Sequence, residues 1–230
     1  MKLAELSQPQ KQLLQQFEAR GGVIDFVVIE LDDELGDDYD THWEAAILAL
    51  DKVSQENDEY FQSLLKEPEY QHHSRDDFFQ ITHDVTQLQG DVISLKSFLG
   101  SFFDLDSKRL LMRGKSKRHI NDLFWVGDEE IPENVVGKCG LYAPESFGLS
   151  DAFFCNPYGI TGSLVELNTL FLDIAEHFFA SFVNAGQIYT WSDDCSNYFD
   201  AGKEWCGTLF CTYFCPPHST IVAALASTTD

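Results

Sequence analysis

Two apolar runs of strand length near the C-terminus constrain the fold of this chain more than any other feature. Residues 207–214 read GTLFCTYF, residues 220–227 read TIVAALAS, and the turn sequence CPPHS lies between them. Runs rich in β-branched and aromatic residues predict strands, and the intervening turn predicts that they pair as an antiparallel hairpin. A β-branched run, VIDFVVIEL over residues 23–31, and a further strand over residues 187–191 extend the predicted sheet.

Long stretches with apolar residues three and four positions apart predict the helices. Thr41 and Glu44 form a capping-box pattern before a helix that runs to about residue 66. Residues 75–103 keep the same spacing through Gly90 and predict a second long helix. Its apolar positions are Phe78, Ile81, Val85, Leu88, Val92, Leu95, Leu99 and Phe102. A short loop joins the two, so they predict an antiparallel helical hairpin with its stripe buried within the chain.

Two shorter helices complete the expected set. One follows Ser7 and ends at Gly21, and another begins at a second capping-box pattern, Ser163 and Glu166. The predicted fold class is therefore α+β, with a long helical hairpin packed against a mixed or antiparallel sheet that ends in the C-terminal hairpin. We expect one α+β domain over residues 1–230. A subdivision into a helix-rich part, 1–105, and a mixed part, 106–230, stays open at this point.

The charge of the chain limits its partners. The formal net charge is −23 and the pI is near 4.4, which disfavours nucleic acid because phosphate contacts need Lys or Arg. The same charge favours a basic partner or a cation. The first residues contain no signal-peptide pattern and no run approaches membrane-spanning length, so no membrane association is expected and the predicted location is the cytoplasm. The six cysteines are accordingly predicted to be reduced.

The acidic segment, residues 32–40, lies between a predicted strand and a predicted helix. Clustered carboxylates in this position suit a divalent cation, but the spacing matches no known metal motif. A surface that faces a partner and a plain solvated loop are the alternatives. The candidate residues here are Asp32, Asp33, Glu34, Asp37, Asp38 and Asp40.

The Trp–Asp cluster, residues 191–205, is the densest group of special residues in the chain. Rigid aromatic side chains beside carboxylates are typical of a recognition surface. The structural alternative is an elaborate turn, in which Asp and Asn bond the local backbone and Trp closes the end of a sheet. The candidate residues here are Trp191, Asp193, Asp194, Asn197, Tyr198, Asp200, Glu204 and Trp205.

This cluster resembles the C-terminal signature of a family of uncharacterised bacterial proteins, some of them found among candidate toxin-immunity proteins. The signature reads roughly W-S-x-x-W-S-N-Y-F-D-x-G-x-E-W-W-G-x-x-x-W, followed by a strand pair. The chain matches it at Trp191, Ser192, Ser196, Asn197, Tyr198, Phe199, Asp200, Gly202, Glu204, Trp205 and Gly207. It departs at Cys195, Cys206 and Cys211, where the signature has Trp. The resemblance implies a bacterial origin and an inhibitor or binding role, and it carries no activity.

No complete catalytic or cofactor motif is present, so we predict no catalytic residue and no cofactor. Cys206, Cys211, Cys215 and His218 could suggest zinc, but their spacing favours packing. The predicted function is that of an acidic cytoplasmic binding protein that inhibits or sequesters a basic protein such as a toxin or nuclease. The alternative is a hydrolase assisted by a divalent metal, which uses carboxylates of the acidic segment or the Trp–Asp cluster.

Overall fold

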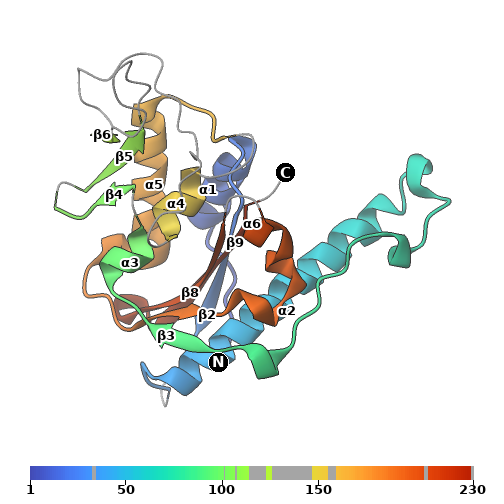
Figure 1. Cartoon of the computed structure of the whole chain (residues 1–230), viewed down its shortest axis with the longest axis horizontal. Helices are drawn as coiled ribbons and strands as arrows, with labels where there is room; N and C mark the ends of the chain where they lie inside the picture. Colours follow the sequence, from blue (N-terminus) through green and yellow to red (C-terminus); the bar gives the residue numbers. More distant parts are fainter. Residues whose placement is uncertain are drawn as a thin grey trace.

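The protein has an α+β fold built on a six-stranded antiparallel sheet (Figure 1). A computed structural model describes residues 1–32, 35–100, 102–106, 108–113, 123–125, 147–154, 159–204 and 207–228. In order across the sheet, the strands are β1 (Lys2–Leu3), β2 (Ile24–Glu30), β9 (Thr220–Ser227), β8 (Thr208–Cys215), β7 (Ile188–Trp191) and β3 (Gly90–Val92). Strands from both sides of residue 105 therefore form this one sheet.

The predicted C-terminal hairpin is confirmed as β8 and β9. The turn Pro216–His218 joins them, and Ser219 takes a left-handed conformation (φ 50°) before β9 begins. Strand β9 lies at the centre of the sheet and is buried along almost its whole length, which explains why its sequence is apolar at consecutive positions. Alternate residues enter two cores. Val222 and Ala224 face one side of the sheet, whereas Ile221 and Ala223 face the other.

Four helices cover the first face of the sheet: α1 (Gln8–Ala19), α3 (Leu95–Leu99), α4 (Leu149–Phe154) and α5 (Leu164–Phe179). Both predicted capping residues are confirmed, since Ser7 begins α1 and Ser163 begins α5, each within a capping box. A small three-stranded sheet, β4 (Phe103–Asp104), β5 (Arg109–Arg113) and β6 (Leu123–Trp125), lies beside these helices.

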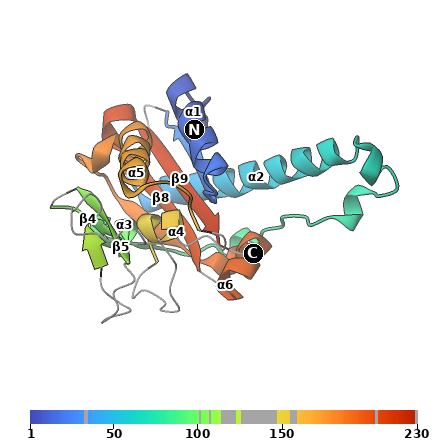
Figure 2. The same ribbon diagram turned by 90° about the horizontal axis from the view of Figure 1, so that it is seen from above.

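The long helix α2 (Tyr39–Leu64) and the short α6 (Asp200–Glu204) lie over the second face (Figures 1 and 2). Only the first half of α2 covers the sheet, through buried residues such as Ala46, Leu50 and Val53. The second half leaves the body, and residues 65–82 turn and run back beside it. We call residues 54–82 the arm.

The prediction of one long helix over residues 75–103, as the second helix of a helical hairpin, is wrong. Residues 75–103 contain 3₁₀ turns at Arg75–Asp77 and Val85–Gln87, strand β3, and α3, instead of one helix. Hydrogen bonds to residues far away in the sequence override the helix tendency of the apolar spacing, because the extended segment bonds to α2 and to the Trp–Asp cluster. Gly90 is part of the reason. A Cβ atom there would lie 2.6 Å from the Trp191 ring, so this residue lets β3 approach β7 closely.

Candidate partner-binding surface

Two carboxylates of the acidic segment, Asp37 and Asp38, stabilise the structure around the start of α2. The Oδ1 atom of Asp38 accepts a hydrogen bond from the Thr41 amide at 2.9 Å, so Asp38 caps α2 and the predicted cap at Thr41 is three residues late. That backbone hydrogen bond lowers the pKa of Asp38. Asp40 lies in the exposed first turn of the helix. Asp32 pairs with the N-terminal ammonium group at 2.6 Å, and Asp33 and Glu34 lie outside the described residues.

Asp37 belongs to a buried chain of hydrogen bonds that reaches the Trp–Asp cluster. Its Oδ1 atom lies 3.1 Å from His42 Nε2, and His42 Nδ1 lies 2.8 Å from Thr212 Oγ1. Trp191 Nε1 donates to the same Thr212 oxygen at 2.9 Å. Burial lowers the pKa of His42, which favours the neutral ring. With Nε2 carrying the proton, every group in the chain has a partner: Trp191 donates to Thr212, Thr212 to His42, and His42 to Asp37.

This Asp–His–Thr arrangement has the connectivity of a catalytic triad but not its access. His42 and Thr212 are both completely buried. The Thr212 hydroxyl is also occupied by the Trp191 N–H, so no substrate carbonyl can approach the oxygen. The network therefore joins α2 to the sheet. Trp191, predicted as a partner contact, is 5% exposed and stacks on Tyr189.

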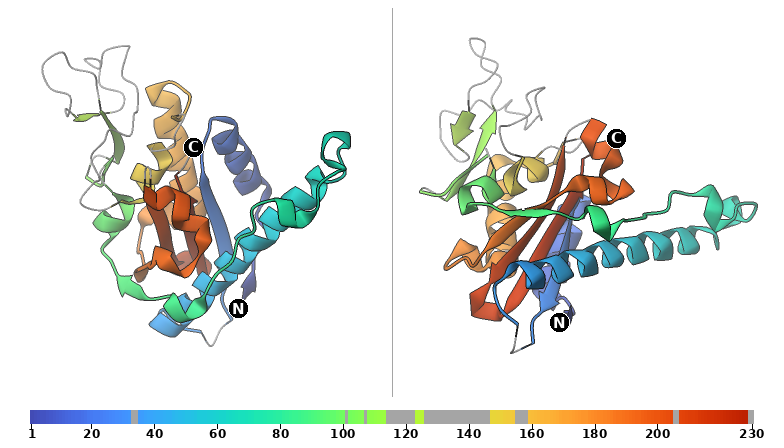
Figure 3. Two further views of the ribbon diagram at one scale, coloured as in Figure 1. Left: turned by 45° about the vertical axis from the view of Figure 1, so that its right-hand side comes forward. Right: turned by 60° about the horizontal axis from the view of Figure 1, so that its bottom comes forward.

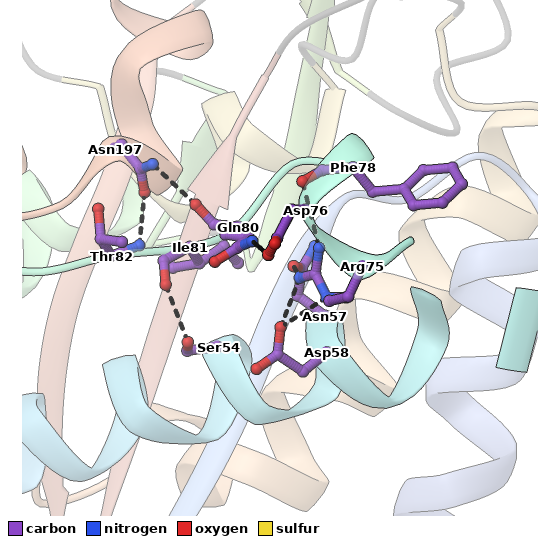
Figure 4. Close-up of polar contacts among 10 residues, drawn as sticks. All are labelled: Ser54, Asn57, Asp58, Arg75, Asp76, Phe78, Gln80, Ile81, Thr82 and Asn197. Carbon is purple, nitrogen blue, oxygen red and sulfur yellow. Dashed lines mark hydrogen bonds and ion pairs between the residues drawn. The ribbon is translucent and has the colours of Figure 1, made fainter. Parts of the chain in front are cut away.

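The Trp–Asp cluster holds the returning segment of the arm, residues 78–82 (Figure 4). Asn197 donates through Nδ2 to the Gln80 carbonyl at 2.9 Å, and its Oδ1 accepts from the Thr82 amide at 2.8 Å. The Ser196 hydroxyl donates to the Thr82 carbonyl at 2.9 Å. Part of the cluster thus binds the protein's own backbone, although at residues far away in the sequence and not in a local turn, as the structural alternative had it for Asn side chains.

The carboxylates of the cluster are largely matched with donors. Asp193 accepts a hydrogen bond from the Thr208 hydroxyl at 2.7 Å, and Lys203 lies 2.8 Å from Asp194 and 3.5 Å from Asp200. The side chains of Asp194 and Asp200 are nonetheless well exposed, at 77% and 68%. Glu204 is exposed beside them, and Trp205 lies outside the described residues.

Tyr198 leads to a carboxyl group that the sequence predictions missed. Its hydroxyl donates to Asp25 Oδ2 at 2.7 Å, and burial raises the pKa of Asp25 to about 6. Asp25 lies within strand β2, in the predicted apolar run of residues 23–31. The signal available in the sequence was this single acidic residue at an interior position of an otherwise apolar strand.

The arm is the largest acidic feature that the predictions did not include. It carries seven acidic and two basic residues, and it extends away from the rest of the molecule (Figure 2). Arg75 holds it together: its guanidinium donates to the Asp58 carboxylate, to Asn57 Oδ1 at 2.9 Å and to the Phe78 carbonyl at 3.2 Å (Figure 4). The same group lies 4.9 Å above the Phe61 ring.

Aromatic side chains are exposed on the arm next to these charges. Tyr60 is 58% exposed and Phe79 is 52% exposed. Nearer the body, the Ser54 hydroxyl donates to the Ile81 carbonyl at 3.0 Å and fixes the returning segment of the arm to α2 (Figure 4). Exposed aromatic residues among carboxylates are the combination that was predicted for a recognition surface, here found on a different segment.

The cysteines that the structure describes are free and buried, namely Cys195, Cys211 and Cys215. Burial raises the pKa of Cys195 to about 11 and that of Cys211 to about 12, which makes both thiols poor nucleophiles and poor metal ligands. Cys206 lies outside the described residues. In the part of the chain that is described, no three His, Cys, Asp or Glu side chains are grouped to hold a metal ion.

Comparison of the chain with protein-family models, curated proteins and solved structures gives no match. Over the described ranges, no helix has both the length and the apolar character needed to cross a membrane.

Proposed function

We propose that this protein is an acidic cytoplasmic binding protein that inhibits or sequesters a basic protein partner. The observation that supports the proposal is the arm. It presents seven acidic residues and exposed aromatic side chains on a projecting unit. Such a surface attracts a basic partner over a distance and offers contact area once the partner has arrived.

The positions of the other carboxylates favour binding over hydrolysis. Metal-assisted hydrolysis would need several of them to converge on one cavity. Instead, Asp38 caps a helix, Asp37 orients His42, and Asp193 accepts from Thr208, so each carboxylate is bonded to a different group of the protein. Asp194 and Asp200 surround Lys203 on the surface.

The test is affinity capture with two charge variants that carry the same net charge. The first replaces Glu59, Glu67 and Glu69 of the arm by Gln, and the second replaces the exposed body residues Glu5, Glu44 and Glu176 by Gln. Basic proteins from the source organism that are retained by the parent are identified by mass spectrometry and titrated with all three proteins.

The proposal expects a basic protein that forms a defined complex with the parent and with the body variant. The arm variant should bind it about tenfold more weakly and with a shallower salt dependence. Equal loss in both variants would mean that only the overall charge matters. Retention of no basic protein, together with turnover of ester or phosphodiester substrates by the parent, would favour the hydrolase alternative.

A further inference from the structure

One edge of the six-stranded sheet is only partly covered. Strand β1 pairs with the far end of β2, at Lys2 with Glu30 and Leu3 with Ile29. The Ala4 amide then donates to the Val28 carbonyl at 2.8 Å, and the chain turns away into α1. Within the described residues, no strand continues this pairing along residues 24–27 of β2.

Among the described residues, the backbone groups along this part of the edge have no hydrogen-bond partner. Successive residues of a strand direct their N–H and C=O groups to opposite sides, and Val28 directs its carbonyl to β1. Phe26 and Ile24 therefore direct theirs to the same edge, beyond the last residue that β1 covers. These two residues offer two donors and two acceptors to an added strand.

A groove runs along this edge. It encloses about 140 Å³ and has β2 as its floor, Leu14 and Glu18 of α1 on one side, and Lys52 and Glu56 of α2 on the other. The two helices lie on opposite faces of the sheet, on either side of β2 (Figure 3, left). A single extended segment would meet only these two helices, whereas a second copy of the sheet edge would bring its own flanking helices against them.

The two sides of the groove differ in chemistry. On the α1 side, Leu6 and Leu14 are apolar and Glu18 is the charged residue. On the α2 side lie the carboxyl groups of Asp25 and Glu56. The Lys52 ammonium group pairs with Glu56 at 2.9 Å, so the lining has three acidic residues and one basic residue. A self-paired dimer would also bring these like charges together.

We propose that an extended segment of a basic partner adds to the open edge of β2 as a further strand. Its backbone would bond Ile24 and Phe26. Every second side chain would be Lys or Arg beside Asp25 and Glu56, and the intervening side chains would be apolar against Leu6 and Leu14. This inference rests on the proposed function, because it names the part of the basic partner that is bound and the place where it binds.

The experiment uses a short peptide that alternates lysine and valine, added to ¹⁵N-labelled full-length protein and followed by NMR. The amide signals of Ile24 and Phe26 should shift and become protected from exchange. A peptide that is N-methylated at alternate amides should bind at least about tenfold more weakly, since it cannot complete the strand pairing. A peptide that alternates glutamate and valine should not shift these signals.

Variants separate the groove from the general charge. Asp25→Asn and Glu56→Gln should each weaken the lysine peptide by about tenfold, whereas Glu69→Gln on the arm and the exposed Asp91→Asn should leave its affinity within about twofold. The thermal stability of Asp25→Asn, measured in parallel, should not fall. Weaker binding therefore cannot come from unfolding.

Three results would overturn the inference. The shifts could fall on residues 57–82 of the arm without Ile24 and Phe26, N-methylation could leave the affinity unchanged, or the edge could be protected by self-association of the protein without peptide. Binding of the peptide to the arm alone would overturn the edge site and leave the proposed function intact. Absence of binding to every basic peptide and basic protein would count against both.

Discussion

The Asp25 carboxyl group lies at a position where a neutral side chain would be buried at a lower cost in free energy of folding. Its pKa of about 6 lies above the ordinary value of 3.8, mainly because burial disfavours the charge. The folded state therefore holds the proton more tightly than the unfolded state. The stability associated with that proton is present below pH 4 and is lost as the pH rises through 6.

Replacement of Asp25 by Asn should stabilise the protein at pH 8. Asn has nearly the same shape, its carbonyl can accept the Tyr198 hydrogen bond, and it carries no charge. The expected gain is about 1 to 3 kcal/mol at pH 8, shrinking to near zero at pH 4, as a shift of about two pH units implies. Denaturant unfolding of both proteins from pH 4 to pH 8 measures it. An equal difference in free energy of unfolding at all pH values would contradict this linkage. Asp91→Asn, at an exposed position, is the control.

Thr212 supports a chain of buried polar groups. Thr212→Val keeps the shape but leaves Trp191 Nε1 and His42 Nδ1 without their partner. We expect the free energy of unfolding to fall by roughly 2 to 4 kcal/mol, because each unsatisfied buried group costs about 1 to 3. Thr169→Val is the control, since that hydroxyl bonds the Val165 carbonyl on an exposed turn of α5. A loss below about 1 kcal/mol in Thr212→Val would show that the network contributes little.

At the scale of elements, the arm is held to the body by a few bonds from the Trp–Asp cluster. Asn197→Ala removes the acceptor of the Thr82 amide and the donor to the Gln80 carbonyl. Hydrogen exchange at Thr82 should become about five- to tenfold faster, with amides of β8 and β9 unchanged, since about 1 kcal/mol of local stability is lost. Asn57→Ala removes the Arg75 hydrogen bond one helical turn beyond Ser54 and should leave Thr82 unchanged. Faster exchange throughout the sheet would mean that the arm and body unfold together.

Elements with strong local signals were predictable from the sequence. The capping boxes at Ser7 and Ser163, the hairpin β8–β9 and strand β2 all follow from residues that are neighbours in the chain. The segment 75–103 was not predictable, because its conformation depends on Ser54 and Asn197, which lie far away in sequence. Its apolar spacing fits a helix equally well, and only those tertiary bonds decide.

The composition of the sequence predicted which segments contain the candidate residues, but it did not predict the role of each residue. Acidic and aromatic residues did mark segments that meet, since Asp37 and Trp191 are linked through His42 and Thr212. The sequence left both a recognition surface and a structural role open for Trp191, and it did not show that Asp37 would join Trp191 through His42 and Thr212, because those bonds depend on tertiary structure. Asp25 was hidden for the opposite reason, as it sits in a strand that otherwise reads as core.

At the scale of the whole molecule, a net charge of −23 should make stability depend on salt. Raising the ionic strength from about 0.01 M to about 0.15 M shortens the screening length from about 30 Å to about 8 Å and weakens repulsion among the carboxylates. We expect Tm to rise by about 2 to 4 °C, which corresponds to about 1 kcal/mol of stability for a chain of this size. Calorimetry at the two salt concentrations tests this. A fall in Tm would mean that attractive pairs such as those of Lys203 dominate.

The central position of β9 sets the order in which the molecule can be completed during synthesis. Strands β2 and β8 both pair with β9, and its residues, Thr220–Ser227, are made about 190 residues after the end of β2. Until then β2 has no long neighbour, and the helices that cover its two faces have no finished sheet to cover. Such pairing between distant segments is slow to form. Until β9 is made, the described neighbour of the apolar strand β2 is the two-residue strand β1, and the edge of β2 that β9 will cover is open to other chains.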